Sequence, residues 1–237
     1  MTAREKLINT AISYVGYTEK ASAENLDDFT ANAGKNNYTS FARDYKNASG
    51  IDVQGQPWCD VFADMMFVYT FGAECAQKML GGFSAYTPTS ANYFKKMNRY
   101  YSKPAPGDVI FFKNSERIYH TGIVRAVDNK YVYTVEGNTS SANGIVENGG
   151  CVAMKSYSLN YDKIAGYGRP LYEAAEREDI MSKFKDIEGH YAEKHIEKLA
   201  EYGVVNGYED GTFRPDEPVT RGQAAVMVAN ALRYLGK

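Results

Sequence analysis

Apolar residues recur at helical spacing in two segments of the first third of the chain. In the first, Thr2 and Glu5 form a capping box, and the apolar positions are Leu7, Ile8, Ala11, Ile12 and Val15. The second segment begins near Pro57, a residue that fits the first turn of a helix, and closes at Gly72. This second pattern places Cys59 at or next to a helix N-terminus.

The rest of the first 172 residues combines loops, short helices and strands. Residues 20–57 are rich in Asn, Asp, Ser and Gly, which is typical of a long loop, with a short helix predicted at 38–45. Another short helix is predicted at 91–100. From Pro104 the pattern becomes alternating and predicts strands at 109–113, 118–127, 131–136 and 151–157. Together these elements predict an α+β fold.

The helical period returns after residues 173–182, a charged stretch that we interpret as a linker. One helix is predicted at 191–203, and Thr220 with Gln223 opens another. The apolar face of this last helix is formed by Ala224, Val228, Ala231, Leu232 and Leu235. We therefore expect a larger domain and a small all-α module, which span residues 1–172 and 183–237.

The composition is that of a globular protein without strong net charge. Of 237 residues, 44% are apolar and 24% are charged, which argues against intrinsic disorder. Lys and Arg number 27 against 29 Asp and Glu, with no basic block, so neither nucleic acid nor anionic lipid is expected as a partner. No apolar run approaches the roughly 20 residues of a membrane span. The first fifteen residues lack the features of a signal peptide.

Cysteine and histidine usage points to one candidate reactive pair. Cys59, Cys75 and Cys151 are odd in number and lack Cys-x-x-Cys spacing, which argues against a disulfide framework or a zinc knuckle. Backbone N–H groups at a helix N-terminus stabilise a thiolate, so Cys59 is the candidate nucleophile. A thiolate needs a base, and His120 is the one histidine of the predicted larger domain. Cys75 and Cys151 are predicted to be small buried or half-buried thiols.

The strand that begins near His120 turns and returns toward Glu136 and Asn138. If a three-residue loop pairs Val127 with Tyr131, then His120 lies opposite Asn138 and diagonal to Glu136. A two-residue turn would shift the register by one residue and put both side chains on the wrong face. In the first register a polar group can orient the histidine while its other ring nitrogen faces the thiol.

Four segments carry a resemblance to a known family. They are residues 56–62, 104–112, 120–124 and 135–139, QPWCDVF, PAPGDVIFF, HTGIV and VEGNT. In this order they resemble a CHAP domain, a family of papain-like cysteine amidases and peptidases of bacterial cell walls. The opening helix and residues 26–44 further resemble CHAP endolysins from phages and prophages of clostridia-like Gram-positive bacteria. The resemblance covers residues 1 to about 172.

The resemblance implies that a thiol attacks an amide of peptidoglycan. Cys59 would be the nucleophile and His120 the general base and then the general acid. Glu136 would orient the histidine, with Asn138 as a second polar support. An N-acetylmuramoyl-L-alanine amidase and an endopeptidase would use the same residues. The sequence therefore does not identify which amide bond is cleaved.

Other residues around this pair have candidate roles. The oxyanion would be held by the Cys59 backbone N–H, with Gln54 or Gln56 as a candidate side-chain donor by position. Trp58 and Tyr119 flank the pair in sequence and either pack or line the cleft. No cofactor is expected.

Some CHAP domains bind calcium in an Asp-x-Asp loop before the cysteine. Here the loop, residues 50–56, holds one carboxylate, Asp52. Because calcium prefers six to eight oxygen ligands, we predict no obligatory metal.

Residues 183–237 resemble an S-layer homology (SLH) module, most clearly in the string DGTFRP at 210–215. The resemblance implies binding to a secondary cell-wall polymer, with Arg221 facing the ligand and Asp186 and Tyr191 as candidate pocket partners. One copy is present, whereas this family usually combines three. We therefore expect the module to be completed by homo-oligomerisation or by docking on the larger domain.

The predicted function is a peptidoglycan hydrolase of the endolysin type. Such a lysin would be made in the host cytoplasm without a signal peptide and released to act on the bacterial cell wall. One alternative is a catalytically inactive cell-wall anchoring protein, and another is a thiol protease that acts on protein substrates.

Overall fold

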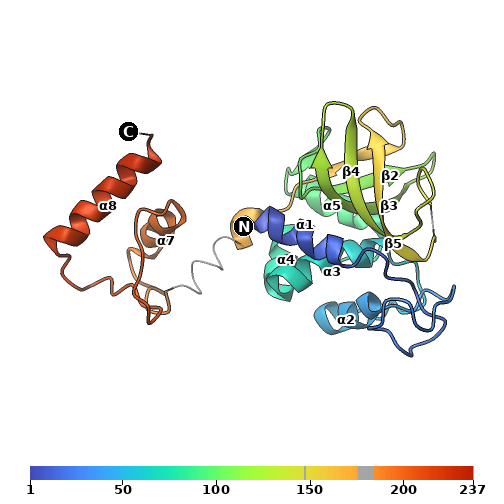
Figure 1. Cartoon of the computed structure of the whole chain (residues 1–237), viewed down its shortest axis with the longest axis horizontal. Helices are drawn as coiled ribbons and strands as arrows, with labels where there is room; N and C mark the ends of the chain where they lie inside the picture. The colour runs from blue at the N-terminus through green and yellow to red at the C-terminus, as the bar shows by residue number, and fades with distance from the viewer. Residues whose placement is uncertain (147, 176–183, 237) are drawn as a thin grey trace. The chain divides into compact units, whose positions relative to one another are not determined.

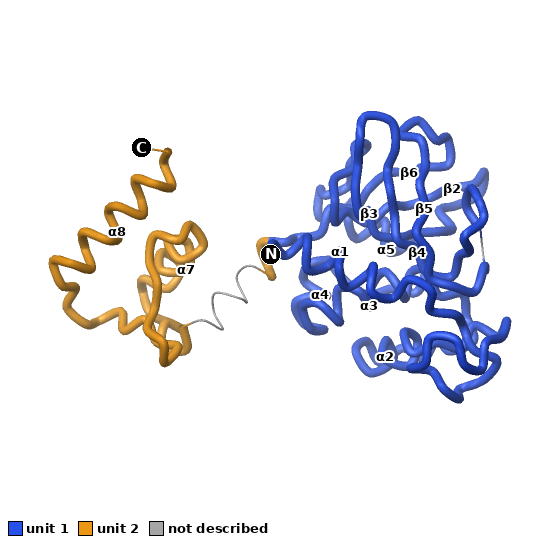
Figure 2. The backbone as a smooth tube through the Cα atoms, in the orientation of Figure 1, with its two compact units in different colours: residues 1–172 blue, residues 173–237 orange. Residues whose placement is uncertain are grey.

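The computed structural model describes residues 1–146, 148–175 and 184–236 (Figure 1). The chain divides into two compact units, residues 1–172 and 173–237 (Figure 2). Most of the predicted linker, residues 173–182, lies outside the described residues. Within the described ranges, no helix combines the length and the apolar character that crossing a bilayer requires.

Unit 1 contains a six-stranded antiparallel sheet in the order β1-β6-β2-β3-β4-β5. The strands are β1 (Tyr100–Tyr101), β2 (Val109–Lys113), β3 (Ile118–Val127), β4 (Tyr131–Thr139), β5 (Cys151–Ser158) and β6 (Ile164–Gly168). Strands β2 and β3 have the predicted bounds. The pattern missed β6, since Gly166 and Gly168 weaken its strand signal. Both glycines are needed because the rings of Tyr100 and Phe94 pack directly on them.

The helices of unit 1 are α1 (Ala3–Ser13), α2 (Ser40–Ser49), α3 (Cys59–Phe71), α4 (Ala73–Leu80) and α5 (Thr87–Lys96). The capping box of Thr2 and Glu5 is present at α1, and α3 begins at Cys59 as predicted. Helix α4 was not predicted, because Gly72 ends α3 and also caps the start of α4. Helices on an antiparallel sheet confirm the α+β class of this unit.

Helix α3 packs closely on β4. A Cβ atom at Gly137 would lie 2.6 Å from Cγ of Phe62 and 2.9 Å from the ring of Trp58. Trp58 is fully buried, stacks on Phe41 at 5.6 Å and donates from Nε1 to the Glu19 carboxylate at 3.0 Å. These contacts hold the N-terminus of α3 in place, and with it Cys59.

The turn between β3 and β4 differs from the prediction. Val127 pairs with Val132 rather than with Tyr131. The connection between the two strands is residues 128–130, three residues as predicted, and the Asp128 N–H donates to the Tyr131 carbonyl at 3.0 Å across it. The predicted loop length is therefore confirmed, whereas the predicted pairing of Val127 with Tyr131 is wrong.

A bulge at Arg125 corrects the register along the same strand pair. The pairing shifts by one residue there, so that Ile123 lies opposite Val135. A one-residue shift moves every following side chain to the other face. His120 and Glu136 consequently share a face, as the sequence predicts, although the bulge rather than the loop brings this about.

Unit 2 contains α7 (Glu193–Glu201) and α8 (Arg221–Tyr234) among its described residues. Its small core joins Phe184, Ile187 and Ile196, with Phe213 packed against them. Helix α8 starts at the predicted capping box, but none of its residues is buried. On the apolar face predicted for this helix, Val228, Leu232 and Leu235 are exposed, whereas Ala224 and Ala231 are half-buried.

Candidate functional site

Three predicted residues meet at one place in unit 1. His120 on β3 and Glu136 on β4 are joined by a hydrogen bond of 2.9 Å between Nε2 and Oε2. The His120 ring also interacts by hydrogen bonding with the Cys59 thiol. Because Nε2 is used by the carboxylate, Nδ1 is the ring nitrogen left for the thiol. The side chains are 7%, 2% and 0% exposed for Cys59, His120 and Glu136.

The cysteine lies where a helix stabilises negative charge. Cys59 is the first residue of α3, and the preceding Trp58 makes no side-chain capping hydrogen bond. The N–H groups of the first turn are therefore not taken up by a cap, and the positive end of the helix dipole lies at the thiol. This is the position at which a helix stabilises a negative charge that develops on a side chain.

The electrostatic surroundings keep His120 protonated. Burial by itself would lower the pKa of this imidazole, but the hydrogen bonds to Cys59 and Glu136 outweigh it and raise the pKa to about 10. Because the pKa of His120 is higher in the folded protein than its ordinary value of 6.5, the folded protein binds this proton more tightly than the unfolded chain. The protonated histidine therefore stabilises the folded state fully below pH 6.5, and this contribution is lost as the pH rises toward 10. At neutral pH the histidine can therefore act as a proton donor.

Gly122 on β3 makes room for the carboxylate, a role that the sequence analysis did not assign. A Cβ atom at this position would collide with Cγ of Glu136 and lie 2.9 Å from the Val135 carbonyl oxygen. The Glu136 side chain therefore crosses over Gly122 on its way to His120. A glycine two residues after the candidate base, on the same strand face, is the signal that could have indicated this.

Asn138 supports a loop rather than the histidine. Its backbone lies in the left-handed region, with φ of 53°, at a bulge between Glu136 and Thr139. Its Nδ2 donates to Asn148 at 3.2 Å, and its Oδ1 accepts from the Gly150 N–H at 3.4 Å. The bulge turns the amide toward the loop that follows β4, which the predicted regular strand pairing did not anticipate.

The residues proposed to hold the oxyanion or to line the cleft have different surroundings in the structure. Gln54 is committed to Thr39, because its Oε1 accepts from the Thr39 N–H at 3.0 Å and its Nε2 donates to the Thr39 carbonyl at 2.9 Å. Gln56 is exposed on the loop before α3. Trp58 packs in the core, and Tyr119 is half-buried beside His120 on β3. Gln56 and the Cys59 backbone N–H thus remain the candidates for oxyanion donors.

The carboxylate of the loop before α3, Asp52, already has hydrogen-bond partners within the protein. Asp52 accepts from Lys46 Nζ at 2.7 Å and from the Gln54 N–H at 3.3 Å. In the described part of the chain, no three His, Cys, Asp or Glu side chains gather as a metal site. The absence of an obligatory metal stays a prediction.

A buried pair of acids lies one turn apart on α3, directly after Cys59. Asp60 is 3% exposed and accepts from the Ser90 hydroxyl at 2.7 Å, and Asp64 accepts from the Ser84 N–H at 3.3 Å. Burial raises the pKa of Asp60 to about 7. Burial and the neighbouring Asp60 charge raise the pKa of Asp64 well above its usual value. Neutral forms of these acids are therefore favoured in the folded state.

This pair predicts a pH-dependent stability. Both carboxyls have a reference pKa of 3.8, so the folded state binds more protons than the unfolded state between about pH 4 and 7, and the free energy of unfolding falls as the pH rises through this window. Asp64→Asn should raise the free energy of unfolding at pH 8 by on the order of 2 kcal/mol and flatten the slope. Urea unfolding at pH 5 and pH 8 measures both, with the exposed Asp162→Asn as control. An unchanged slope in Asp64→Asn would contradict the prediction.

The residues predicted to bind polymer in unit 2 do not form one cluster. The Asp186 carboxylate accepts from the N–H groups of Phe213 and Arg214, both at 2.8 Å, and so holds the 210–215 string in place. Tyr191 is 89% exposed, with its ring 4.5 Å from that of His190. Arg221 is exposed at the first turn of α8. Asp186 therefore has a structural role, whereas Tyr191 and Arg221 are open to solvent.

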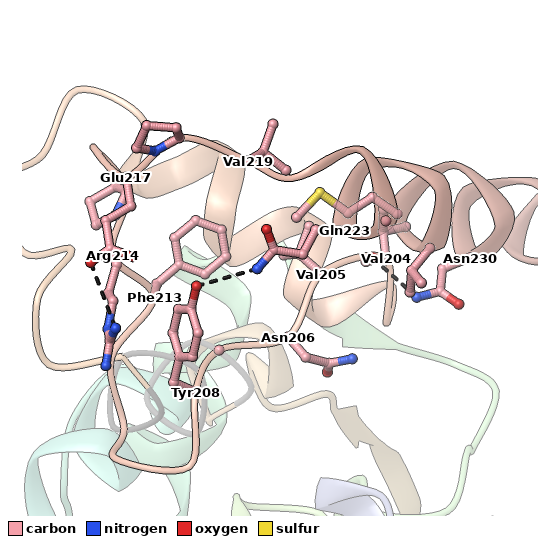
Figure 3. Close-up of a pocket in the computed structure, with 16 residues that line it drawn as sticks. Val204, Val205, Asn206, Tyr208, Phe213, Arg214, Glu217, Val219, Gln223 and Asn230 are labelled. Carbon is pink, nitrogen blue, oxygen red and sulfur yellow. Dashed lines mark hydrogen bonds and ion pairs between the residues drawn. The ribbon is translucent and has the colours of Figure 1, made fainter.

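Other residues line a pocket in unit 2 of about 580 Å³ (Figure 3). Tyr208 accepts from Gln223 Nε2 at 3.3 Å, and the Arg214 guanidinium lies 4.2 Å over the Tyr208 ring. Arg214 also pairs with Asp210 at 2.9 Å, so its charge is already balanced. The remaining wall is largely apolar and includes Val204, Val205, Phe213, Val219, Val226 and Met227.

Comparison with known families gives a separate match in each of the two units. The CHAP domain family matches residues 51–138, a range that contains Cys59, His120 and Glu136. The S-layer homology domain family matches residues 183–225, a range that contains Asp186 and Arg221. The chain carries a CHAP domain and an SLH domain. Their order along the chain is the order that the sequence analysis predicts.

Similar proteins share short stretches with this chain. The "Cellulosome-anchoring protein" of Acetivibrio thermocellus is 41% identical over 54 residues, 23% of this chain and 12% of that protein. "Cell surface glycoprotein 1" of the same organism is 42% identical over 50 residues, 21% of this chain and 2% of that protein. "Outer membrane protein SlpA" of Thermus thermophilus is 39% identical over 56 residues, 23% of this chain and 6% of that protein.

This chain therefore spans at most 12% of the length of these three relatives. No solved structure matches the chain significantly. The CHAP domain points to a peptidoglycan amidase or peptidase, and the SLH domain points to cell-wall anchoring.

Proposed function

We propose that the protein is a cysteine-dependent peptidoglycan hydrolase whose SLH domain binds it to the cell wall. The observation that carries this proposal is the arrangement of Cys59, His120 and Glu136. A thiol at a helix N-terminus interacts with an imidazole, and a buried carboxylate orients that imidazole at 2.9 Å. This is the geometry of a thiol nucleophile with a base and an orienting group.

The proposed reaction has two steps. In the first, the Cys59 thiolate attacks the carbonyl carbon of an amide, and protonated His120 gives its proton to the leaving amine as the C–N bond breaks. In the second, His120 takes a proton from water, the resulting hydroxide attacks the thioester, and the acid product leaves with the thiolate restored. Glu136 accepts from Nε2 throughout, so the ring keeps Nδ1 toward the sulfur.

The oxyanion of each tetrahedral intermediate needs donors that are free. Gln54 is excluded as a simple donor, since both ends of its amide bond to Thr39. We assign this role to the Cys59 backbone N–H at the start of α3, with Gln56 as the candidate second donor. Such a donor contributes about 2.7 to 4 kcal/mol to lowering the barrier.

The SLH domain is proposed to bind a secondary cell-wall polymer, with Arg221 and Tyr191 as the exposed candidate contacts. We also propose that it self-associates. Its helix α8 exposes the apolar side chains Val226, Val228, Leu232 and Tyr234. The pocket beside α8 has an apolar wall. A second copy of the chain offers a matching apolar helix, and covering these side chains removes apolar surface from water.

Self-association predicts a concentration-dependent molar mass. In light scattering after gel filtration, the wild type should exceed the monomer mass of 26.4 kDa as its concentration rises, whereas Leu232→Glu should stay a monomer because it puts a charge on the apolar face. Arg233→Glu, next to it on the helix, is the control and should associate like the wild type. A wild-type monomer at the highest concentration would exclude self-association and favour docking on unit 1.

The endolysin form of this proposal rests on the resemblance of residues 1–172 to phage and prophage lysins. In that form the protein would collect in the host cytoplasm and act on the wall after release. The alternative is a wall anchor without catalysis, and the similarity of 54 residues to the Cellulosome-anchoring protein of Acetivibrio thermocellus is the observation in its favour.

Mass spectrometry of soluble fragments tests the proposal. Purified Gram-positive peptidoglycan should release stem peptides or cut cross-links with the wild type and not with Cys59→Ala, and the fragments should identify the bond. Cys75→Ala, a substitution at another buried cysteine, is the matched control and should leave the fragments unchanged. Both Cys59→Ala and the wild type should bind walls.

Two results would redirect the proposal. If walls of several cross-link types yield no Cys59-dependent fragment but still bind the protein, the anchor is the better function. If casein is cleaved and walls are not, the protein is a thiol protease.

A further inference from the structure

Glu136 accepts two hydrogen bonds besides the one from His120. The Thr134 hydroxyl donates to Oε1 at 2.5 Å, and the Tyr157 phenol donates to Oε2 at 3.1 Å. Thr134 is fully buried and Tyr157 is 4% exposed, so neither is placed to touch a substrate. Resting on the function proposed above, we infer that Thr134 and Tyr157 are positioning residues that hold the Glu136 carboxylate on the His120 ring.

Each carboxylate oxygen has its own donor. With Thr134 on Oε1 and Tyr157 on Oε2, the plane of the carboxylate cannot rotate without breaking a hydrogen bond to a charged group, which is among the stronger hydrogen bonds in proteins. Oε2 therefore stays 2.9 Å from Nε2 of His120. Supporting contacts of this kind keep a functional side chain within a fraction of an ångström of its working position.

The two donors are themselves fixed by the sheet. Thr134 lies two residues before Glu136 on β4 and so shares its face. Tyr157 lies on β5 opposite Val132, and its ring is held by Phe112 at 4.7 Å and by Tyr161 at 5.4 Å. The Tyr157 hydroxyl cannot move away from the carboxylate without disturbing this ring packing, and Thr134 is fully buried beside it.

The other polar groups around the carboxylate are engaged elsewhere. Lys155 on β5 interacts electrostatically with Glu136. Its ammonium, however, donates hydrogen bonds to the Ser140 and Ala142 carbonyls. Burial and the Glu136 charge raise the pKa of Tyr157. The phenol therefore stays protonated and remains a hydrogen-bond donor over the pH range of an assay. The hydroxyls of Thr134 and Tyr157 are thus the direct partners of the carboxylate besides His120.

The test compares Tyr157→Phe and Thr134→Val with the wild type, each alone and in a Glu136→Gln background. The readouts are kcat and KM for wall hydrolysis and the rate of Cys59 alkylation by chloroacetamide at neutral pH, followed on the Cys59 peptide by mass spectrometry. Each single variant should lower kcat and the alkylation rate about tenfold, with KM nearly unchanged. In the Glu136→Gln background the same substitutions should have no further effect, because they act through that carboxylate.

Two controls separate positioning from general packing. Thr134→Ser keeps the hydroxyl and should restore wild-type rates, and Tyr133→Phe removes a hydroxyl from the opposite face of the same strand and should change nothing. Effects that persist in the Glu136→Gln background, or single variants with wild-type rates, would overturn the inference. A wild type without Cys59-dependent hydrolysis would instead remove the proposed function, and the alkylation rates would still decide on positioning.

Discussion

Replacing His120 by glutamine is expected to lower the rate of peptidoglycan hydrolysis about 10³-fold, within the range of general acid and base catalysis. Glutamine cannot carry a proton from the thiol to the leaving amine. Its amide can still donate to Glu136, so the buried carboxylate is not left without a partner. Initial rates of fragment release from purified walls, with unfolding measured in parallel, check this expectation.

The control for this substitution is His195→Gln, since His195 is exposed in the SLH domain. It should hydrolyse walls at the wild-type rate. If His120→Gln is folded and keeps more than a tenth of the wild-type rate, His120 is not the base and the proposed mechanism is wrong. If His120→Gln hydrolyses walls slowly and is also unfolded, hydrolysis cannot be interpreted. The alkylation rate of Cys59 is then the measurement to make, because it depends on the Cys59–His120 pair and needs no turnover.

Gly122→Ala is expected to destabilise unit 1 by about 3 kcal/mol, at the upper end for overpacking, and to remove most activity. The new methyl group would occupy the space of Cγ of Glu136, so either the strand or the carboxylate must move. Moving the carboxylate breaks its 2.9 Å hydrogen bond to His120. Urea unfolding and wall hydrolysis measure the two effects.

A double-mutant cycle shows whether this collision is the cause. In a Glu136→Ala background the crowding atom is gone, so Gly122→Ala should cost at least about 1 kcal/mol less than in the wild type. Gly222→Ala, where a Cβ atom meets nothing closer than 3.9 Å, is the matched control and should leave unit 1 unchanged. Equal costs in both backgrounds would mean that Gly122 is needed for the backbone and not for Glu136.

The sequence predicted which residues form the candidate site, but only some of the contacts between them. Cys59 and His120 could be paired from sequence because Cys59 is predicted at a helix start and His120 is the one histidine of the predicted larger domain. Gln54 matched an oxyanion role by position along the chain. In the structure its amide bonds to Thr39, a partner 15 residues away that no local pattern indicates.

The sequence by itself determined the order of domains, the α+β class of the larger unit and the placement of Cys59 at a helix N-terminus. These follow from hydrophobic periodicity, capping residues and ordered motifs, which are properties of neighbouring positions. Only the tertiary structure decided that a bulge at Arg125 sets the register, that Thr134 and Tyr157 donate hydrogen bonds to Glu136, and that α8 buries none of its residues within unit 2. Such contacts join distant segments, and they depend on strand register and packing, which residue types alone do not specify.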